Sequence, residues 1–444
     1  MKTINLTLAL FFCVGLSCFA LNTDTGKFFK TGPAPAKGLS ADQVYPRGQL
    51  FPFTFYSVGG GSEQKRGELL PEEERIADQK QIIDAGVTMI GPQYELNDQV
   101  VADAKKYKVK AVYHIYAKID GQNANAHPYL EKLAKERKEL DVEKLRKSVI
   151  EIVKRESANP EIAWWNIGEE MRCWCKQDML CLKTISEAIK ETDPQKRPMY
   201  MYEPGHRDAK SLSKTAPFQN IIGKGMYVNY SGKKDSRVFC RWTIEQEIEG
   251  IKLSGNKDAI PIMVPEMFQQ PSESDLPMIE SWVRHDVYSA LIAGAKGVAV
   301  FSASKRENFK AREQYLKAYL QVCRELTGSL KLGQVFLFGE RKDDISLTVT
   351  EGPETVELKV NKETLPYPSA AIANIAHENC RYVFVSNSSD KQLEAVIDGL
   401  VYGKGVTVQN VFDPKEEFTA PEGNFNIVLK PWEVKAFKIF LAGK

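Results

Sequence analysis

The chain has 444 residues, of which 60 are basic and 58 acidic, so its formal net charge is only +2. With 43% hydrophobic and 27% charged residues, the composition is that of a folded globular protein and excludes extensive disorder. The near-neutral charge argues against nucleic acid or an anionic membrane as a partner, and the length suits one large domain with a smaller one.

The N-terminus has the pattern of a signal peptide. Lys2 supplies a positive charge, residues 6–18 form a short apolar core, and Cys18-Phe19-Ala20 resembles a small-x-small cleavage site. We therefore expect residues 1–20 to be removed and the mature protein to be exported to the periplasm, the cell surface or the medium. A lipidated Cys18 is the alternative, although the residues before it fit a lipoprotein signal poorly. No other segment is long and apolar enough to cross a bilayer, so we expect no membrane span.

After an irregular lead-in at residues 21–44, short apolar or aromatic runs alternate with segments of helical periodicity. Continuous apolar runs are typical of parallel strands that are buried on both faces. The runs occupy residues 49–56, 87–90, 110–116, 162–167, 198–202, 222–228, 260–264 and 297–301.

Helices are predicted between these runs. Residues 71–86 place acids in the first turn and end on Gly86, and residues 141–157 begin on Asp141, a favourable N-cap. Residues 179–193 and 278–295 show the same apolar spacing. Eight strands alternating with helices is the count of a (β/α)8 barrel, so we predict an α/β fold with a TIM barrel over residues 45–328. An open doubly wound sheet is the alternative.

The pattern changes in the last quarter of the chain. Short segments there alternate between apolar and polar residues and are separated by Gly, Asn, Asp and Pro, which is typical of antiparallel strands. We predict a smaller all-β sandwich domain over residues 329–444. The candidate strands are residues 345–350, 355–360, 381–387, 393–400, 406–412 and 425–430.

Six cysteines follow the predicted signal peptide, and three of them, Cys173, Cys175 and Cys181, lie close together in sequence. Their C-x-C-x5-C spacing differs from the paired spacing of common zinc sites, so we expect no metal centre here. Export permits disulfides. We expect disulfides within this loop, with Cys240 as a possible fourth member, and the pairing stays open.

Glutamates follow the fourth and seventh apolar runs. Glu169 and Glu170 end the stretch WWNIGEEM, and Glu266 stands alone inside VPEMF. Barrel enzymes carry their chemistry at the carboxyl ends of strands, and an isolated carboxylate after an apolar run is costly unless it has a role. Two carboxyl groups about 5 to 5.5 Å apart are what a retaining glycosidase needs. Glu203, after the fifth run, is a competitor for either role.

The stretch WNIGEEM resembles the W-x-I-G-N-E motif of clan A glycoside hydrolases. The resemblance implies that Glu170 is the acid/base, with Glu169 as the alternative, and that Glu266 in IPIMVPEMF is the nucleophile. It departs from the clan at Glu169, where an Asn that contacts the sugar 2-hydroxyl is expected. The passage IKETDPQKRPMYMY also resembles the clan, where a D-P-x-x-R-P stretch is common.

The resemblance also extends to the sixth and eighth strands. In the clan, a Tyr near the end of strand six holds the nucleophile, which implies Tyr227 or, as second choice, Tyr230. A Trp is expected at the end of strand eight, but Phe301 and Ser302 stand there. The C-terminal stretch FNIVLKPWEVKAFKIF resembles the last strands of the sandwich that such barrels carry.

Aromatic and polar side chains at other strand ends are candidate substrate-binding residues. Aromatic rings present apolar area to sugar faces, although core packing is the alternative for each of them. His114, on the third run, is equally open to a binding or a core role. The substrate-binding candidates are Glu169, His114, Tyr56, Tyr116, Tyr202, Glu203, Tyr227, Tyr230 and Phe268.

From these observations we expect an exported, retaining glycoside hydrolase that acts on an oligo- or polysaccharide and needs no metal or organic cofactor. A non-catalytic glycan-binding barrel is the alternative, because Glu169 replaces the expected Asn and the strand-eight Trp is missing. A structural cell-surface module is a third hypothesis. The sequence leaves the sugar, the linkage and the oligomeric state open.

Overall fold

The structure is a computed structural model that describes residues 51–60, 68–400, 406–420 and 422–440. The predicted signal peptide and lead-in lie outside these residues. Within the described part of the chain, no helix is long and apolar enough to cross a membrane.

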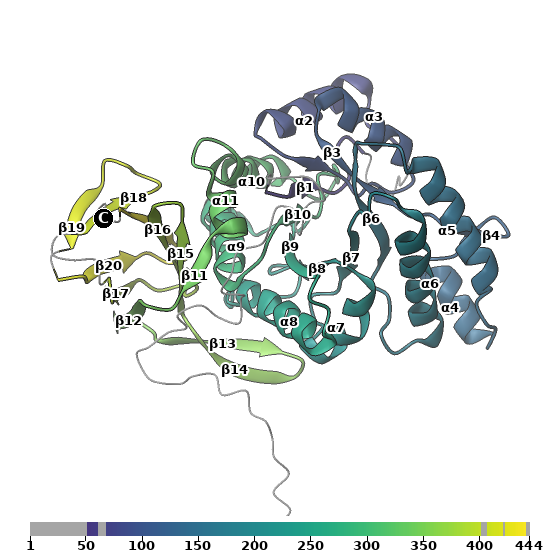
Figure 1. Cartoon of the computed structure of the whole chain (residues 1–444). Helices are drawn as coiled ribbons and strands as arrows, with labels where there is room; N and C mark the ends of the chain where they lie inside the picture. The colour runs from purple at the N-terminus through teal and green to yellow at the C-terminus, as the bar shows by residue number, and fades with distance from the viewer. Residues whose placement is uncertain (1–50, 61–67, 401–405, 421, 441–444) are drawn as a thin grey trace, which may run out of the picture.

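Eight parallel strands form the barrel predicted from the sequence, and each of the eight apolar runs overlaps one of them (Figure 1). Thr88 N donates to Phe53 O at 3.2 Å and Gly91 N donates to Phe55 O at 3.1 Å, so backbone hydrogen bonds join the two ends of the sheet. The barrel is therefore closed, and the open sheet is excluded. The strands are β1 (Phe53–Phe55), β2 (Met89–Ile90), β3 (Lys110–His114), β6 (Ile162–Glu169), β7 (Met199–Glu203), β8 (Ile221–Met226), β9 (Ile260–Pro265) and β10 (Val298–Val300).

Helices surround this sheet, and the four helices predicted from the sequence are among them (Figure 1). Asp141 caps α5 as expected, because its side chain accepts a hydrogen bond from Lys144 N at 3.0 Å. A small hairpin of β4 (Lys118–Ile119) and β5 (Gln122–Asn123) follows β3. The helices are α2 (Glu72–Asp84), α3 (Asn97–Tyr107), α4 (His127–Lys135), α5 (Val142–Glu156), α6 (Lys176–Thr192), α7 (Ala209–Thr215), α8 (Phe239–Ser254), α9 (Ile279–Ala293) and α10 (Arg312–Thr327).

Tyrosine rings fill the barrel beneath its mouth. Gly223 and Gly225 on β8 leave the space that two of these rings occupy, since a Cβ at either position would lie 2.4 Å from an atom of Tyr200 or Tyr202. The hydroxyl groups of Tyr200 and Tyr56 are 2.5 Å apart and share a hydrogen bond. A polar layer of tyrosines therefore supports the residues at the strand ends.

The C-terminal part is a β-sandwich, as predicted. After α11 (Leu332–Phe338), a six-stranded antiparallel sheet packs against a three-stranded one around an apolar core. A hairpin of β13 (Thr355–Val360) and β14 (Glu363–Pro368) extends from it. The other strands are β11 (Glu340–Lys342), β12 (Ser346–Glu351), β15 (Ala370–His377), β16 (Cys380–Asn387), β17 (Leu393–Asp398), β18 (Val406–Asn410), β19 (Glu417–Ala420), β20 (Phe425–Leu429) and β21 (Val434–Phe440).

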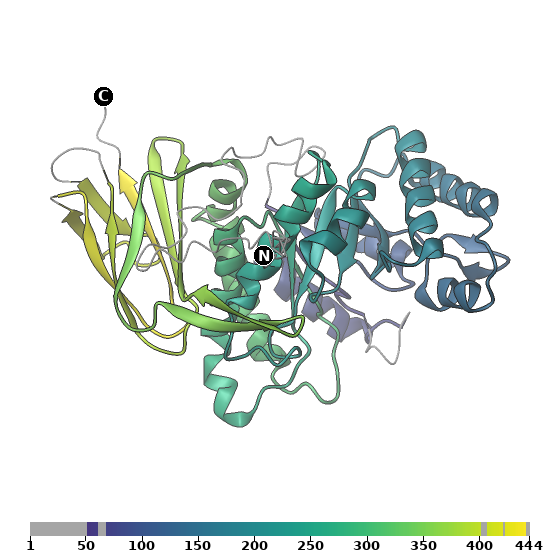
Figure 2. The same ribbon diagram turned by 90° about the horizontal axis from the view of Figure 1, so that it is seen from below.

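The sandwich lies beside the barrel, on the opposite side from α4, α5 and α6 (Figures 1 and 2). Buried arginines cross the interface in both directions. Arg241 of α8 donates to the carbonyl oxygens of Pro368 and Ala370, at 2.9 and 3.1 Å. Arg341 of β11 donates to the carbonyl oxygens of Leu291 and Ile292 in the last turn of α9, at 2.8 and 2.7 Å.

The expected disulfides are wrong in this structure, because all six cysteines that it describes are free thiols. Cys175 is the N-cap of α6, whereas Cys181 is buried within that helix with its sulfur 3.8 Å from the carbonyl oxygen of Ala124. Cys240 lies on α8. Cys181 therefore belongs to a helix and not to the loop that holds Cys173 and Cys175.

Candidate functional site

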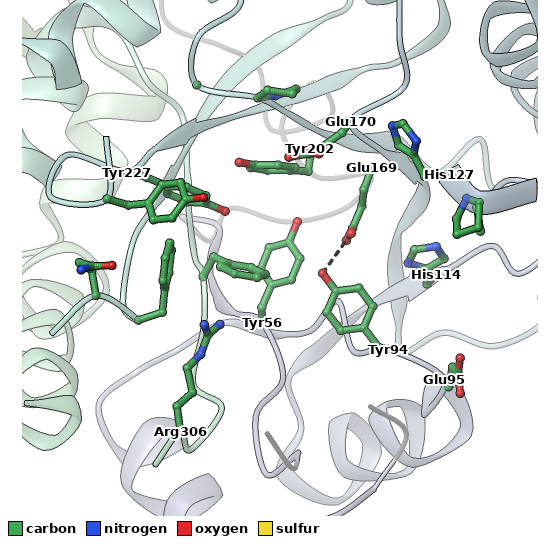
Figure 3. A pocket seen from close by; sticks show the side chains of 18 of the residues that line it. Tyr56, Tyr94, Glu95, His114, His127, Glu169, Glu170, Tyr202, Tyr227 and Arg306 are labelled. Atoms are coloured by element: carbon green, nitrogen blue, oxygen red, sulfur yellow. Dashed lines mark hydrogen bonds between the residues drawn. The ribbon is translucent and has the colours of Figure 1, made fainter. Parts of the chain in front are cut away.

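A cavity of about 1160 Å³ opens at the carboxyl ends of the barrel strands (Figure 3). Its volume exceeds the roughly 300–1,000 Å³ typical of sites for drug-sized ligands, so it has room for a molecule larger than that. Nine of the predicted site residues line it: Glu169, Glu170, His114, Tyr56, Tyr116, Tyr202, Tyr227, Tyr230 and Phe268.

Glu169 is the last residue of β6, and its side chain points toward Tyr94 across the cavity (Figure 3). The Tyr94 hydroxyl donates to Glu169 Oε2 at 3.0 Å. A donor to the carboxylate favours its charged form. The position at which the clan resemblance expects an amide therefore carries an acid with an ordered hydroxyl partner.

Glu170 follows the strand in the left-handed region, with φ of +54°, and its side chain is exposed where it lines the cavity. Its amide donates to Tyr202 O at 2.9 Å, and its carbonyl oxygen accepts from Arg207 Nη2 at 3.1 Å. Such a conformation costs energy in a residue other than glycine and persists where the surroundings hold it. The neighbouring β7 segment thus fixes the direction in which Glu170 leaves the strand.

Glu266 follows β9 as predicted but is not among the described residues that line the cavity. Its carboxylate accepts hydrogen bonds from the amides of Asn229 and Tyr230, at 2.5 and 3.0 Å. Burial raises the pKa of this carboxyl from 4.5 to about 7, although the two amides favour the charged form. Backbone amides, rather than the Tyr227 or Tyr230 hydroxyl suggested by the resemblance, are the hydrogen-bond donors that hold this carboxylate.

Aromatic rings from the same loops form one wall of the cavity. Tyr227 stacks on Tyr202 and on Phe301, with ring centroids 5.9 and 5.8 Å apart, and meets the edge of Phe268 at 5.1 Å. Phe301 therefore stands in the cavity wall at the place where the resemblance expects a Trp. This wall offers apolar area of the kind that sugar rings stack on.

Glu203 does not line the cavity, so its candidacy for catalysis or binding is not supported. Its buried carboxylate is paired with Arg207 and accepts hydrogen bonds from Thr215 Oγ1 at 2.5 Å and Gln219 Nε2 at 2.9 Å. Burial raises its pKa and the Arg207 cation opposes that rise. The same arginine holds the backbone of Glu170, so Glu203 acts as a structural support for the cavity.

His114 lines the cavity as a neutral imidazole, because burial lowers its pKa to about 3. Its Nδ1 lies 3.1 Å from the side-chain amide nitrogen of Asn166, which has only hydrogens to give. Nδ1 is therefore the acceptor, and Nε2 carries the proton. The ring stacks on Tyr116 at 4.2 Å between centroids.

Several lining residues come from loops that the sequence analysis did not single out. Arg306 follows β10 and lies over the Phe268 ring at 4.9 Å, and His127 begins α4. The sequence could have indicated that Arg306 belongs to the site, because only a few residues separate it from the end of the eighth strand. His127 lies in a long excursion after the third strand, where sequence spacing gives no indication of position.

The D-P-x-x-R-P stretch is a brace behind β6. Asp193 and Arg197 form a buried ion pair at 2.9 Å, and Asp193 also accepts from Trp165 Nε1 at 2.9 Å. The Arg197 guanidinium lies over the Trp165 ring at 4.4 Å. The motif therefore anchors the strand that carries Glu169 and Glu170.

The described residues contain no cluster of three or more His, Cys, Asp or Glu side chains arranged to hold a metal ion. The polar groups of the cavity are carboxylates, phenols, imidazoles, side-chain amides, a serine hydroxyl and one guanidinium. Such a set can donate and accept protons and can bind hydroxyl-rich molecules through stacking and hydrogen bonds.

The chain matches no known family model and no curated protein in sequence. Its structure is similar to an α-amylase from Anoxybacillus, with a TM-score of 0.54 at 8% identity over 89% of this chain and 99% of that one. A GH42 β-galactosidase from G. stearothermophilus gives a TM-score of 0.52 at 7% identity over 91% and 99%. An α-amylase from Geobacillus thermoleovorans in complex with acarbose gives 0.50 at 10% identity over 88% and 98%.

At such identities the likeness establishes the fold. The protein is a (β/α)8 barrel with a β-rich C-terminal domain, the fold that the sequence predicted.

Proposed function

We propose that this protein is a glycoside hydrolase that binds a glycan in the cavity at the barrel mouth. The observation that carries the proposal is the combination of Glu169 and Glu170 at the end of β6 with an aromatic wall, in one large cavity of a glycosidase-like barrel. Fold alone does not define an activity, so the residues of the cavity carry the argument.

In the proposed mechanism, Glu170 protonates the leaving glycosidic oxygen and Glu266 attacks the anomeric carbon, forming a glycosyl-enzyme. Glu170 then deprotonates a water molecule that releases the sugar with retained configuration. Attack requires an ionised Glu266, and the raised pKa of about 7 implies that turnover increases as pH rises through that value. The two amides at its oxygens would hold the carboxylate in position.

A second candidate function is glycan binding without hydrolysis. It is favoured by the position of Glu266, which faces the amides of Asn229 and Tyr230 and does not line the cavity. A retaining mechanism through Glu266 requires this carboxylate to reach the bound sugar.

The test is a screen of the mature protein on neutral and acidic oligosaccharides, read by released reducing sugar and by calorimetric binding. Glu170→Gln and Glu266→Gln are each expected to lower turnover at least about a hundredfold while leaving binding largely intact. Glu73→Gln, an exposed change on α2, is the control. Undiminished hydrolysis by Glu266→Gln would overturn its role, whereas binding without turnover of any glycan would favour the binding function.

We also propose that the protein is exported, on the basis of the N-terminal pattern of residues 1–20. Fractionation of cells that produce the full chain tests this, with Cys18→Ser as the variant. Release of the protein into a soluble fraction by this substitution would favour a lipid anchor over simple cleavage, and retention of the precursor in the cytoplasm would refute export.

A further inference from the structure

A second cavity of about 600 Å³ adjoins the first and lies between the end of β3, the β4–β5 hairpin and α5. His114 and Tyr116 line both cavities, so one stacked pair of rings forms a shared wall. The Tyr116 hydroxyl accepts a hydrogen bond from Glu95 N at 2.7 Å, which fixes this wall. We call this second cavity the basic groove.

The charges of the two cavities have opposite signs. Four glutamates and one arginine line the main cavity, namely Glu95, Glu169, Glu170, Glu307 and Arg306. Four basic and two acidic side chains line the groove, namely Lys118, Lys144, Lys147, Arg155, Asp120 and Glu151. An anionic group is therefore disfavoured in the main cavity and favoured in the groove next to it.

Part of the basic charge in the groove is already paired. Lys144 contacts Asp120 at 3.0 Å and Arg155 contacts Glu156 at 2.8 Å. Among the residues that the structure describes, Lys118 and Lys147 have no carboxylate within ion-pair distance, and both are exposed. These two lysines are the cations available to a ligand.

The groove is also held in shape. The Lys118 amide donates to Ser148 Oγ at 2.9 Å, which ties the hairpin to α5. Lys118 therefore extends from a braced hairpin, and Lys147 projects from a helix that Asp141 caps. Cations on rigid elements lose less freedom when they bind a partner than cations on loops.

We propose that the basic groove binds an anionic substituent, a carboxylate or a sulfate, on a glycan whose uncharged sugar occupies the main cavity. This inference rests on the proposed glycan binding and adds the substrate class to it. The glycan chain would pass over the shared wall of His114 and Tyr116, from the acid-lined mouth to the lysines.

The test compares three oligosaccharides of equal backbone: one neutral, one with a uronate and one with a sulfate. Calorimetry measures binding to the mature protein, to a Lys118→Glu/Lys147→Glu double variant, and to Lys154→Glu, a control on α5 outside the groove. The anionic ligands are expected to bind the native protein at least about tenfold more tightly than the neutral one. That preference should weaken with added salt and disappear in the double variant alone.

Each outcome decides the point. A preference for only one of the anionic ligands identifies the substituent. Equal affinity of the native protein for all three ligands, or an equal effect of Lys154→Glu, would overturn the inference while leaving the proposed function intact. If none of the three binds, the inference fails; if no other glycan binds in the screen either, the proposed function fails with it.

Discussion

Glu266 is a buried carboxyl group whose proton affinity is set by two opposing effects. Burial raises its pKa to about 7, while the amides of Asn229 and Tyr230 stabilise the charged form. In the unfolded chain the same group titrates near its ordinary value of 4.5. Between these two values the folded state holds a proton that the unfolded state has released.

The stability contributed by this site therefore falls as pH rises from about 4.5 to about 7 and changes no further above that. The difference in pKa is equivalent to about 3 kcal/mol, taken as an upper limit. In Glu266→Gln this dependence is absent, so its stability relative to the native protein should increase across this range. Urea unfolding at pH 5 and pH 8 measures the effect. Parallel changes in the two proteins would contradict the assigned pKa.

For Glu169, Glu170 and Glu266 the sequence predicts the position along the chain better than the direction of the side chain. Each was located at a strand end because polar residues there follow continuous apolar runs. The direction of the Glu266 side chain was not predictable, because the amides that it accepts from belong to the loop after another strand, residues 229–230.

At the scale of single elements, β6 depends on the brace formed by Asp193 and Arg197. Both side chains are essentially inaccessible to solvent, so neither charge can be satisfied by water if its partner is removed. Breaking a buried ion pair from one side leaves an uncompensated charge.

We predict that Asp193→Ala destabilises the protein by about 3–5 kcal/mol, since Arg197 loses its carboxylate partner and Trp165 Nε1 loses its acceptor. Asp141→Ala, which removes the N-cap of α5, should cost only about 1 kcal/mol and serves as the control. Chemical unfolding followed by tryptophan fluorescence compares the two variants. A loss for Asp193→Ala no larger than that of the control would refute the brace.

Helices and strands were predictable from the sequence where a single pattern decides the structure. The eight barrel strands are buried on both faces and therefore read as apolar runs, whereas β15 is alanine-rich and was not recognised. The disulfide expectation failed because linear spacing does not reveal that α6 begins between Cys173 and Cys181. Arg306 lies in an irregular segment and His127 begins a helix within a long excursion, and the position of both depends on the completed barrel.

At the scale of the whole molecule, the barrel and the sandwich share buried polar contacts. Besides Arg241 and Arg341, His285 of α9 lies between Asp286 and Ser388, at 2.9 Å from each. Burial lowers the pKa of this histidine, so Nδ1 donates to the carboxylate and Nε2 is the acceptor that faces the hydroxyls of Ser388 and of Ser289 in α9. Separating the domains would break the hydrogen bonds of Arg241 and Arg341 to the opposite domain and that between His285 and Ser388.

We therefore predict that the protein unfolds in a single calorimetric transition. Arg241→Met removes two hydrogen bonds to the sandwich and leaves the carbonyl oxygens of Pro368 and Ala370 without their buried donor. This variant should melt at a lower temperature, by an amount equivalent to about 2–4 kcal/mol. Two separate transitions in the native protein would show that the domains unfold independently.

Arg341 affects the order in which parts of the chain can fold during synthesis. It satisfies carbonyl oxygens at the end of α9, a helix whose last residue is synthesised almost fifty positions earlier. Until β11 has left the ribosome, the carbonyl oxygens of Leu291 and Ile292 lack the guanidinium that donates to them in the folded protein. The last turn of α9 is therefore completed only after β11 has been synthesised, so this part of the barrel wall depends on a segment of the C-terminal domain.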